Sequence, residues 1–94
     1  MVPEPQVADA FRNLLGTGDE ADRCYAARAL GAMGDNDSIE ALIDHLRDED
    51  TDVCVDAAEA LGRIGAAEAV PSLIESLEND NSGEVCKAVA GALG

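Results

Sequence analysis

Residues Asp50–Gly65 read DTDVCVDAAEALGRIG, and similar segments precede and follow them. The earlier copy, DEADRCYAARALGAMG, occupies residues 19–34, and a shorter copy, SGEVCKAVAGALG, occupies residues 82–94. The copies share an ALG signature, whose leucines are Leu30, Leu61 and Leu93. The signature therefore recurs after 31 and then 32 residues, a period that predicts a stacked array of repeats.

The central copy has the pattern of one amphipathic helix. Its polar side is expected to comprise Asp52, Asp56, Glu59 and Arg63, and its apolar side Val53, Ala57, Ala60, Leu61 and Ile64. Asp50 or Thr51 can accept hydrogen bonds from the first free N–H groups, and Gly65 can adopt the left-handed conformation that ends a helix. Alanines at matched positions of the copies predict close approach of neighbouring helices.

A second helix follows each complete copy, because apolar residues recur there at i, i+3, i+4 and i+7. These residues are Ile39, Leu42, Ile43 and Leu46 in one unit and Val70, Leu73, Ile74 and Leu77 in the next. Val7, Ala10, Phe11 and Leu14 show the same spacing. We therefore expect an all-α domain over residues 1–94, with about six antiparallel helices in an α-solenoid.

The predicted units are an N-terminal half-repeat (5–18), two repeats (19–49 and 50–80) and a C-terminal half-repeat (81–94). The turn-rich segment 79–83 accommodates the extra residue of the second interval. The last half-repeat lacks a partner helix, so the chain is expected to be a piece of a longer solenoid. The apolar side of Val85, Val89 and Leu93 should then be buried in a self-contact, a dimer or further sequence.

The charge balance narrows the classes of partner. The 94 residues contain 20 acidic and 6 basic side chains, for a net charge of −14. A surface of this sign argues against nucleic acid and against anionic membrane lipid. Two interpretations stay open: adaptation to a cytoplasm of high salt, and an acidic docking surface for a basic partner. The sequence has no long apolar run and no signal-peptide pattern, which predicts a cytoplasmic protein.

Residues with catalytic or metal-binding chemistry are few and scattered. Cys24, Cys54 and Cys86 form no CxxC pair, so they predict structural cysteines, with neither a disulfide framework nor a zinc site. His45 is the only histidine, and the serines fall where helix capping or solvation explains them. We therefore expect no catalytic residues, no bound metal and no cofactor.

The pattern D-x-x-V-C-x-x-A-A-x-A-L-G-x-I-G, followed by A-V-P-x-L-I-x-x-L, resembles the HEAT-like repeat of the phycobilisome-lyase type. The resemblance covers residues 19–94. Cys54 and Cys86 depart from it where that pattern usually has arginine, whereas Arg23 keeps the arginine. The resemblance implies an α-solenoid of antiparallel helix pairs, a fold shared by scaffolds, bilin lyase subunits and deoxyhypusine hydroxylase.

Each of these functions implies different residues. The hydroxylase-like repeats carry His-Glu pairs for a di-iron site, and the matching positions here hold Cys24-Tyr25, Val55-Asp56 and Lys87-Ala88. A bilin lyase-like role, our second choice, calls for aromatic and basic groups to meet a tetrapyrrole, and this chain has few. The preferred interpretation is a non-catalytic scaffold for protein–protein interaction.

The predicted binding surface uses the second helix of each unit, which the resemblance places on the inner side of the solenoid. Its residues are Glu40, Asp44, Arg47, Asp48, Glu75 and Glu78. The repeat register places Asp44 beside Glu75 and Arg47 beside Glu78. We expect this acidic surface to bind another protein through a basic helix or tail, with self-association through the C-terminal half-repeat as a further possibility. The alternative is a solvated surface without a partner.

Overall fold

The computed structural model of the chain describes residues 5–79 and 83–93. These residues form six α-helices and no strand. The helices are α1 (Pro5–Thr17), α2 (Glu20–Met33), α3 (Ile39–His45), α4 (Thr51–Ile64), α5 (Val70–Asn79) and α6 (Gly83–Leu93). Short 3₁₀ turns at Asn36–Ser38 and Ala67–Ala69 precede α3 and α5. The predicted all-α solenoid of helix pairs is confirmed, while the extra residue assigned to segment 79–83 falls largely on residues outside the described ranges.

The ends of α2 and α4 follow from their flanking residues. The side chain of Asp50 accepts hydrogen bonds from the backbone N–H groups of Asp52 and Val53, at 2.9 and 3.2 Å. Asp19 does the same for α2, accepting from the N–H of Asp22 at 2.9 Å. Both helices end at a glycine with positive φ, 65° at Gly34 and 75° at Gly65.

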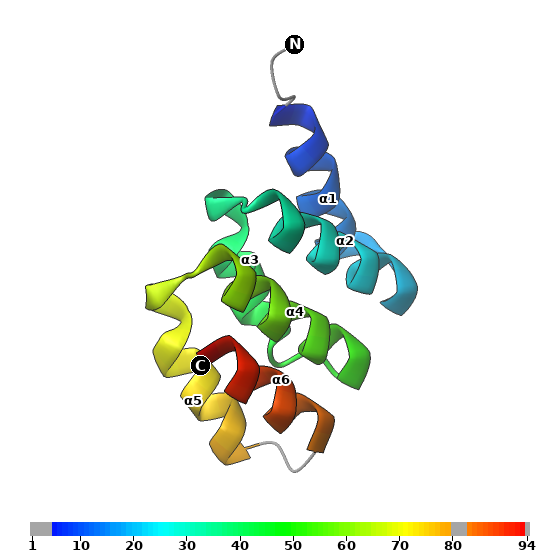
Figure 1. Cartoon of the computed structure of the whole chain (residues 1–94). Helices are drawn as coiled ribbons and strands as arrows, with labels where there is room; N and C mark the ends of the chain where they lie inside the picture. The colour runs from blue at the N-terminus through cyan, green and yellow to red at the C-terminus, as the bar shows by residue number, and fades with distance from the viewer. Residues whose placement is uncertain (1–4, 80–82, 94) are drawn as a thin grey trace.

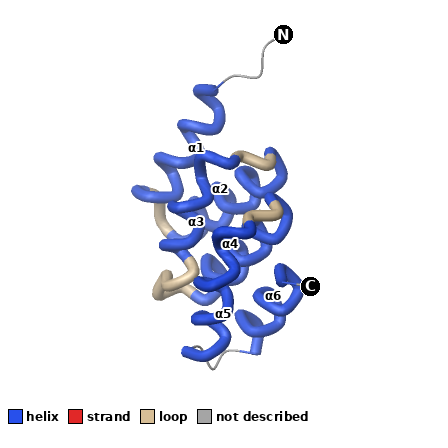
Figure 2. The backbone as a smooth tube through the Cα atoms, turned by 90° about the vertical axis from the view of Figure 1, so that its left-hand side faces the viewer, coloured by secondary structure: helices blue, strands red, loops and turns tan. Residues whose placement is uncertain are grey.

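The helices form two layers. The helices α2, α4 and α6 lie side by side in one layer, and α1, α3 and α5 form the other (Figure 1). Figure 2 shows the order along the stack, from α1 at one end to α5 and α6 at the other. Each helix of one layer packs on a helix of the other, and the principal extents of the molecule are 42 × 27 × 15 Å.

The layer of α2, α4 and α6 is the more closely spaced one. A Cβ placed on Gly31 would lie 2.7 Å from the Cα of Ala60, and one on Gly62 would lie 2.8 Å from the Cα of Ala92. These helices therefore touch through glycine and alanine, whereas α3 and α5 stay farther apart. The layer that the sequence analysis assigned to the inner surface is therefore the less closely spaced one.

The apolar core lies between the two layers. Its largest fully buried side chains are Leu15, Leu30, Leu42, Val53, Leu61, Val85 and Val89. Val85 and Val89 are buried within the chain itself, which is the first of the three alternatives given for this apolar side in the sequence analysis. The exposed apolar residues at this end are Val70, Ile74 and Leu93. Leu93 is 38% exposed, whereas Leu61, at the same repeat position, is 1% exposed because α6 covers it.

Candidate functional site

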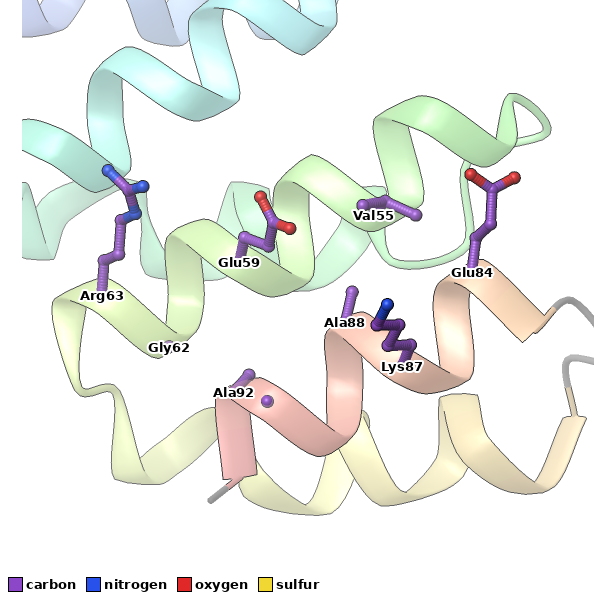
Figure 3. A pocket seen from close by; sticks show the side chains of 9 residues that line it. Val55, Glu59, Gly62, Arg63, Glu84, Lys87, Ala88 and Ala92 are labelled. Atoms are coloured by element: carbon purple, nitrogen blue, oxygen red, sulfur yellow. The ribbon is translucent and has the colours of Figure 1, made fainter.

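Two open grooves run along the layer of α2, α4 and α6. The groove between α2 and α4 has a volume of about 510 Å³ and is lined by Ala21, Cys24, Tyr25, Arg28, Asp52, Val55, Asp56 and Glu59. The groove between α4 and α6 has a volume of about 710 Å³, and its lining includes Val55, Glu59, Arg63, Glu84, Lys87, Ala88 and Gly91. Figure 3 shows the second groove, with the side chains of both helices projecting on the same side.

The same four repeat positions of each helix line these grooves. They are occupied by Ala21, Cys24, Tyr25 and Arg28 in α2, by Asp52, Val55, Asp56 and Glu59 in α4, and by Glu84, Lys87, Ala88 and Gly91 in α6. We call these twelve residues the groove face. Because the positions recur with the repeat, the groove face runs continuously across the three helices.

The groove face differs between repeats at positions where the packing does not require a particular residue. Some packing positions keep their residue type, with alanine at 27, 58 and 90 and leucine at 30, 61 and 93, while others change, as at Asp22, Val53 and Val85. The groove position of Cys24 holds Val55 in α4 and Lys87 in α6, and that of Arg28 holds Glu59 and then Gly91. The groove positions thus change in charge and size between repeats that share the alanine and leucine contacts, as expected for the binding surface of a solenoid.

The charges of the groove face centre on α4. Asp52, Asp56 and Glu59 place three carboxylates along one side of this helix. The cations are Arg28 on α2 and Lys87 on α6, with Arg63 at the edge of the second groove. The groove between α2 and α4 therefore has an excess of negative charge, while the groove between α4 and α6 contains Glu59, Glu84, Arg63 and Lys87 in balance.

Asp56 is a buried carboxylate at the centre of this face. It lies on the predicted polar side of α4, yet its side chain is only 5% exposed. Its Oδ2 atom lies 3.2 Å from Nε of Arg28, but that oxygen accepts no hydrogen bond in the described structure. Contact with Asp56 raises the pKa of the Arg28 guanidinium. Burial, reinforced by Asp56, raises the pKa of the Cys24 thiol to about 12.

The residues predicted as the binding surface lie on the other layer. Glu40 and Asp44 on α3 and Glu75 and Glu78 on α5 are exposed. Arg47 forms an ion pair with Glu75, not with Glu78 beside which the register placed it. Asp44 shares a small groove with Ser72 and Ser76 of α5. This second surface, formed by Glu40, Asp44, Arg47, Glu75 and Glu78, is called the α3–α5 face below.

Asp48, the sixth predicted residue, does not belong to that face. Its side chain is 8% exposed and pairs with Arg23, with Nε of Arg23 3.0 Å from Oδ2. Its Oδ1 also accepts the backbone N–H of Asp50 at 2.9 Å, and its carbonyl oxygen accepts the thiol of Cys54 at 2.9 Å. Asp48 therefore joins α2, the turn after α3 and the start of α4.

The described part of the chain contains neither a metal-binding cluster nor a membrane-spanning helix. Within residues 5–79 and 83–93, no group of three His, Cys, Asp or Glu side chains is placed to hold a metal ion. His45 makes a local contact, with Nδ1 2.8 Å from the carbonyl oxygen of Ala41. In the same ranges, no helix combines the length and the apolar character needed to cross a bilayer.

Sequence reasoning found the polar side of α4 but missed the grooves that it lines. Tyr25 and Arg28 were missed as site residues because each is unremarkable within its own helix. The repeat register could have revealed them, because aligning the copies separates positions that keep their residue from positions that vary. That comparison finds the groove positions but not the burial of Asp56, which depends on the distance between α2 and α4.

A family model described as HEAT repeats matches residues 8–94, nearly the whole chain. The search of curated proteins gives no match.

Proposed function

Because this chain belongs to the HEAT repeat family, whose members generally mediate protein–protein interaction, we propose that it is a non-catalytic scaffold that binds a partner protein on its groove face. The family is generally non-enzymatic. The residues that line the two grooves support the scaffold role and the assignment of partner binding to the groove face.

The observation that carries the proposal is the recurrence of the groove positions. Twelve residues at four repeat positions line two adjacent grooves, and they vary in charge and size between helices that share alanine and leucine at their contact positions. Exposed charged groups and the half-exposed ring of Tyr25 lie together there. Partner-binding surfaces combine such an aromatic anchor with a charged rim.

The α3–α5 face is the second candidate surface. It has four exposed carboxylates and one arginine, so its charge suits a basic helix or tail, as the sequence analysis proposed. Its recessed area is smaller, with a groove of about 170 Å³. The smaller groove and the wider helix spacing make it the less favoured surface.

Capture of partners from a lysate of the native cells tests which face binds. The groove variant replaces Glu59 and Glu84 by lysine, and the matched variant replaces Asp44 and Glu75 by lysine. All four side chains are exposed and each pair lies on two neighbouring helices of one layer, so both variants should fold and both change the net charge equally. We expect the groove variant to lose partners that the wild type and the matched variant retain.

Loss of the same partners only in the matched variant would move the proposal to the α3–α5 face. Retention of every partner by both variants would contradict a charge-dependent docking surface and assign the acidity to solubility. The assignment to a cytoplasm of high salt stays a prediction of the sequence.

The bilin lyase-like alternative also stays a prediction. It requires a saturable shift in the absorbance of an added bilin, which a scaffold for proteins would not produce. The hydroxylase-like alternative requires bound iron, which elemental analysis of the purified protein measures.

A further inference from the structure

We propose that the groove between α2 and α4 receives an arginine side chain of the partner protein, with its guanidinium stacked on Tyr25 and paired with Asp52 and Glu59. This inference rests on the proposed function and names the chemistry that the groove face recognises.

The aromatic wall of the groove is exposed and held in place. The side chain of Tyr25 is 61% exposed, the largest exposed fraction among the big apolar and aromatic residues of the described ranges. Its ring meets the ring of Phe11 edge-on, with centroids 5.6 Å apart and an interplanar angle of 65°. The contact fixes the ring at the groove, where a planar cation can stack on its free face.

The opposite wall supplies the negative charge. Asp52, Asp56 and Glu59 line the groove from α4, against Arg28 from α2; Arg63 lines the adjoining hollow together with Arg28, Asp56 and Glu59. Asp52 and Glu59 are exposed and seven residues apart on one helix side, so about 10 Å separates their backbones. A cation lying between them, above Val55 and Asp56, has a carboxylate on either side.

Asp56 makes the centre of the groove selective for a cation. A buried carboxylate is costly unless it is fully paired, and Oδ2 of Asp56 has an ion-pair partner but no hydrogen bond within the described residues. The fold does not need an acid here, because Tyr25 and Ala88 occupy the same repeat position in α2 and α6. A costly residue that packing does not require points to a function in recognition.

The arrangement favours arginine over lysine. A guanidinium is planar, stacks on aromatic rings and has donors along more than one edge, so it can meet Tyr25 and two carboxylates together. An ammonium is a more strongly hydrated point charge. Arg28 itself, 72% exposed, already holds its Nε atom against Asp56, which is the same pairing made within the chain.

The neighbouring groove lacks this preference. In that groove Lys87 occupies the repeat position of Cys24 and Val55, so it adds a cation that the groove between α2 and α4 lacks. Glu84, which matches Asp52 by position, is therefore balanced by neighbouring positive charge. The cation site is confined to the groove between α2 and α4.

Tyrosine fluorescence provides a direct test, because Tyr25 is the only tyrosine and the chain has no tryptophan. The probe is the peptide acetyl-Gly-Arg-Gly-amide, titrated at low ionic strength. The same peptide with lysine tests the preference between cations, and the same peptide with citrulline keeps the shape of arginine without its charge. We expect a saturable change in emission with the arginine peptide, a weaker affinity with lysine, and no saturable change with citrulline.

Two variants locate the site. Replacing Asp52 by asparagine and Glu59 by glutamine should weaken binding of the arginine peptide by about fivefold or more. The matched variant, with Asp37 replaced by asparagine and Glu68 by glutamine, loses the same charge at exposed positions of the two 3₁₀ turns, outside both faces, and should bind within about twofold of the wild type. Far-UV circular dichroism confirms that both variants are folded.

Three results would overturn the inference: no saturable change with the arginine peptide, an equal change with citrulline, or equal binding by the two variants. An affinity for lysine equal to that for arginine would reject the guanidinium preference. These outcomes are separate from those of the capture experiment, because a partner could still dock on the groove face without inserting an arginine.

Discussion

At the scale of single residues, charged groups serve either the fold or the groove face. Arg12 pairs with Asp9 and Asp35, and Arg23 with Asp48, so these groups tie one helix to the next turn. The contacts with these carboxylates raise the pKa of both guanidinium groups. The sequence could not separate Asp48 from Asp44, because both are acidic residues near the end of one helix. Asp48 is held inward by Arg23, which lies 25 residues away in sequence, and by the backbone N–H of Asp50.

Replacement of Asp56 by asparagine should make Cys24 more reactive. Burial and then Asp56 raise the pKa of the Cys24 thiol to about 12, so near pH 9 only about one thiol in a thousand is ionised. Loss of the carboxylate lowers this pKa toward its ordinary value and increases the thiolate fraction. Alkylation by iodoacetamide near pH 9, followed at Cys24 by peptide mass spectrometry, should therefore be faster in the variant.

Glu59→Gln is the control for that experiment, because Glu59 lines the same groove but is not among the groups that raise the pKa of Cys24. Its alkylation rate should equal that of the wild type. An Asp56→Asn protein whose Cys24 reacts no faster than wild-type Cys24 would contradict the contact between these two side chains.

At the scale of elements, the helices could be predicted more completely than their spacing. The caps Asp19, Asp50, Gly34 and Gly65 mark α2 and α4 in the sequence, and the structure has each of them. The apolar pattern of the second helix of the first repeat runs to Leu46, but α3 ends at His45. There the backbone tightens, with the N–H of Leu46 donating to the carbonyl of Ile43 and the N–H of Arg47 to that of Asp44. Which layer is more closely spaced depends on contacts between repeats, and the period does not reveal these.

Replacing Gly31 by alanine should destabilise the chain. The new Cβ would lie 2.7 Å from the Cα of Ala60, so α2 and α4 must separate. Overpacking of this kind costs about 1–3 kcal/mol. Urea unfolding followed by circular dichroism measures the change as a lower midpoint.

Gly91→Ala is the matched control, because it lies within α6 and a Cβ there meets no atom within 4 Å. Alanine in an open helical position should stabilise the chain by about 0.5–1 kcal/mol. Equal effects of the two substitutions would show that the Gly31 contact does not set the spacing of the helices.

At the scale of the whole molecule, the net charge of −14 should make stability depend on salt. Repulsion between like charges is screened as the Debye length falls from about 10 Å at 0.1 M salt to about 3 Å at 1 M. The melting temperature should therefore rise over this range of potassium chloride. A flat or falling melting temperature would count against adaptation to high salt and favour the docking interpretation of the acidity.

The exposed apolar residues near α5 and α6 should promote self-association once salt screens the repulsion. Val70, Ile74 and Leu93 form this set, and Ile74→Glu should shift the sedimentation equilibrium toward monomer. Met33→Glu is the control, because Met33 is similarly exposed at the end of α2. A wild-type protein that remains monomeric at every concentration tested would contradict this prediction.

The repeat architecture and the polar side of α4 could thus be predicted from the period and the helical pattern, while the groove face could not. Its grooves arise where neighbouring helices meet through Gly31 and Ala60 and through Gly62 and Ala92. Tyr25 and Glu59 have no distinctive sequence pattern within their own helices. They line one groove only because the repeats stack side by side.

Backbone amide chemical-shift mapping with the captured partner bound tests the groove face most directly. If the partner binds the groove face, the largest chemical-shift changes will cluster at its positions in α2, α4 and α6, around Tyr25, Val55 and Lys87. Shifts that cluster instead around Asp44 and Glu75, with the groove positions unchanged, would contradict it.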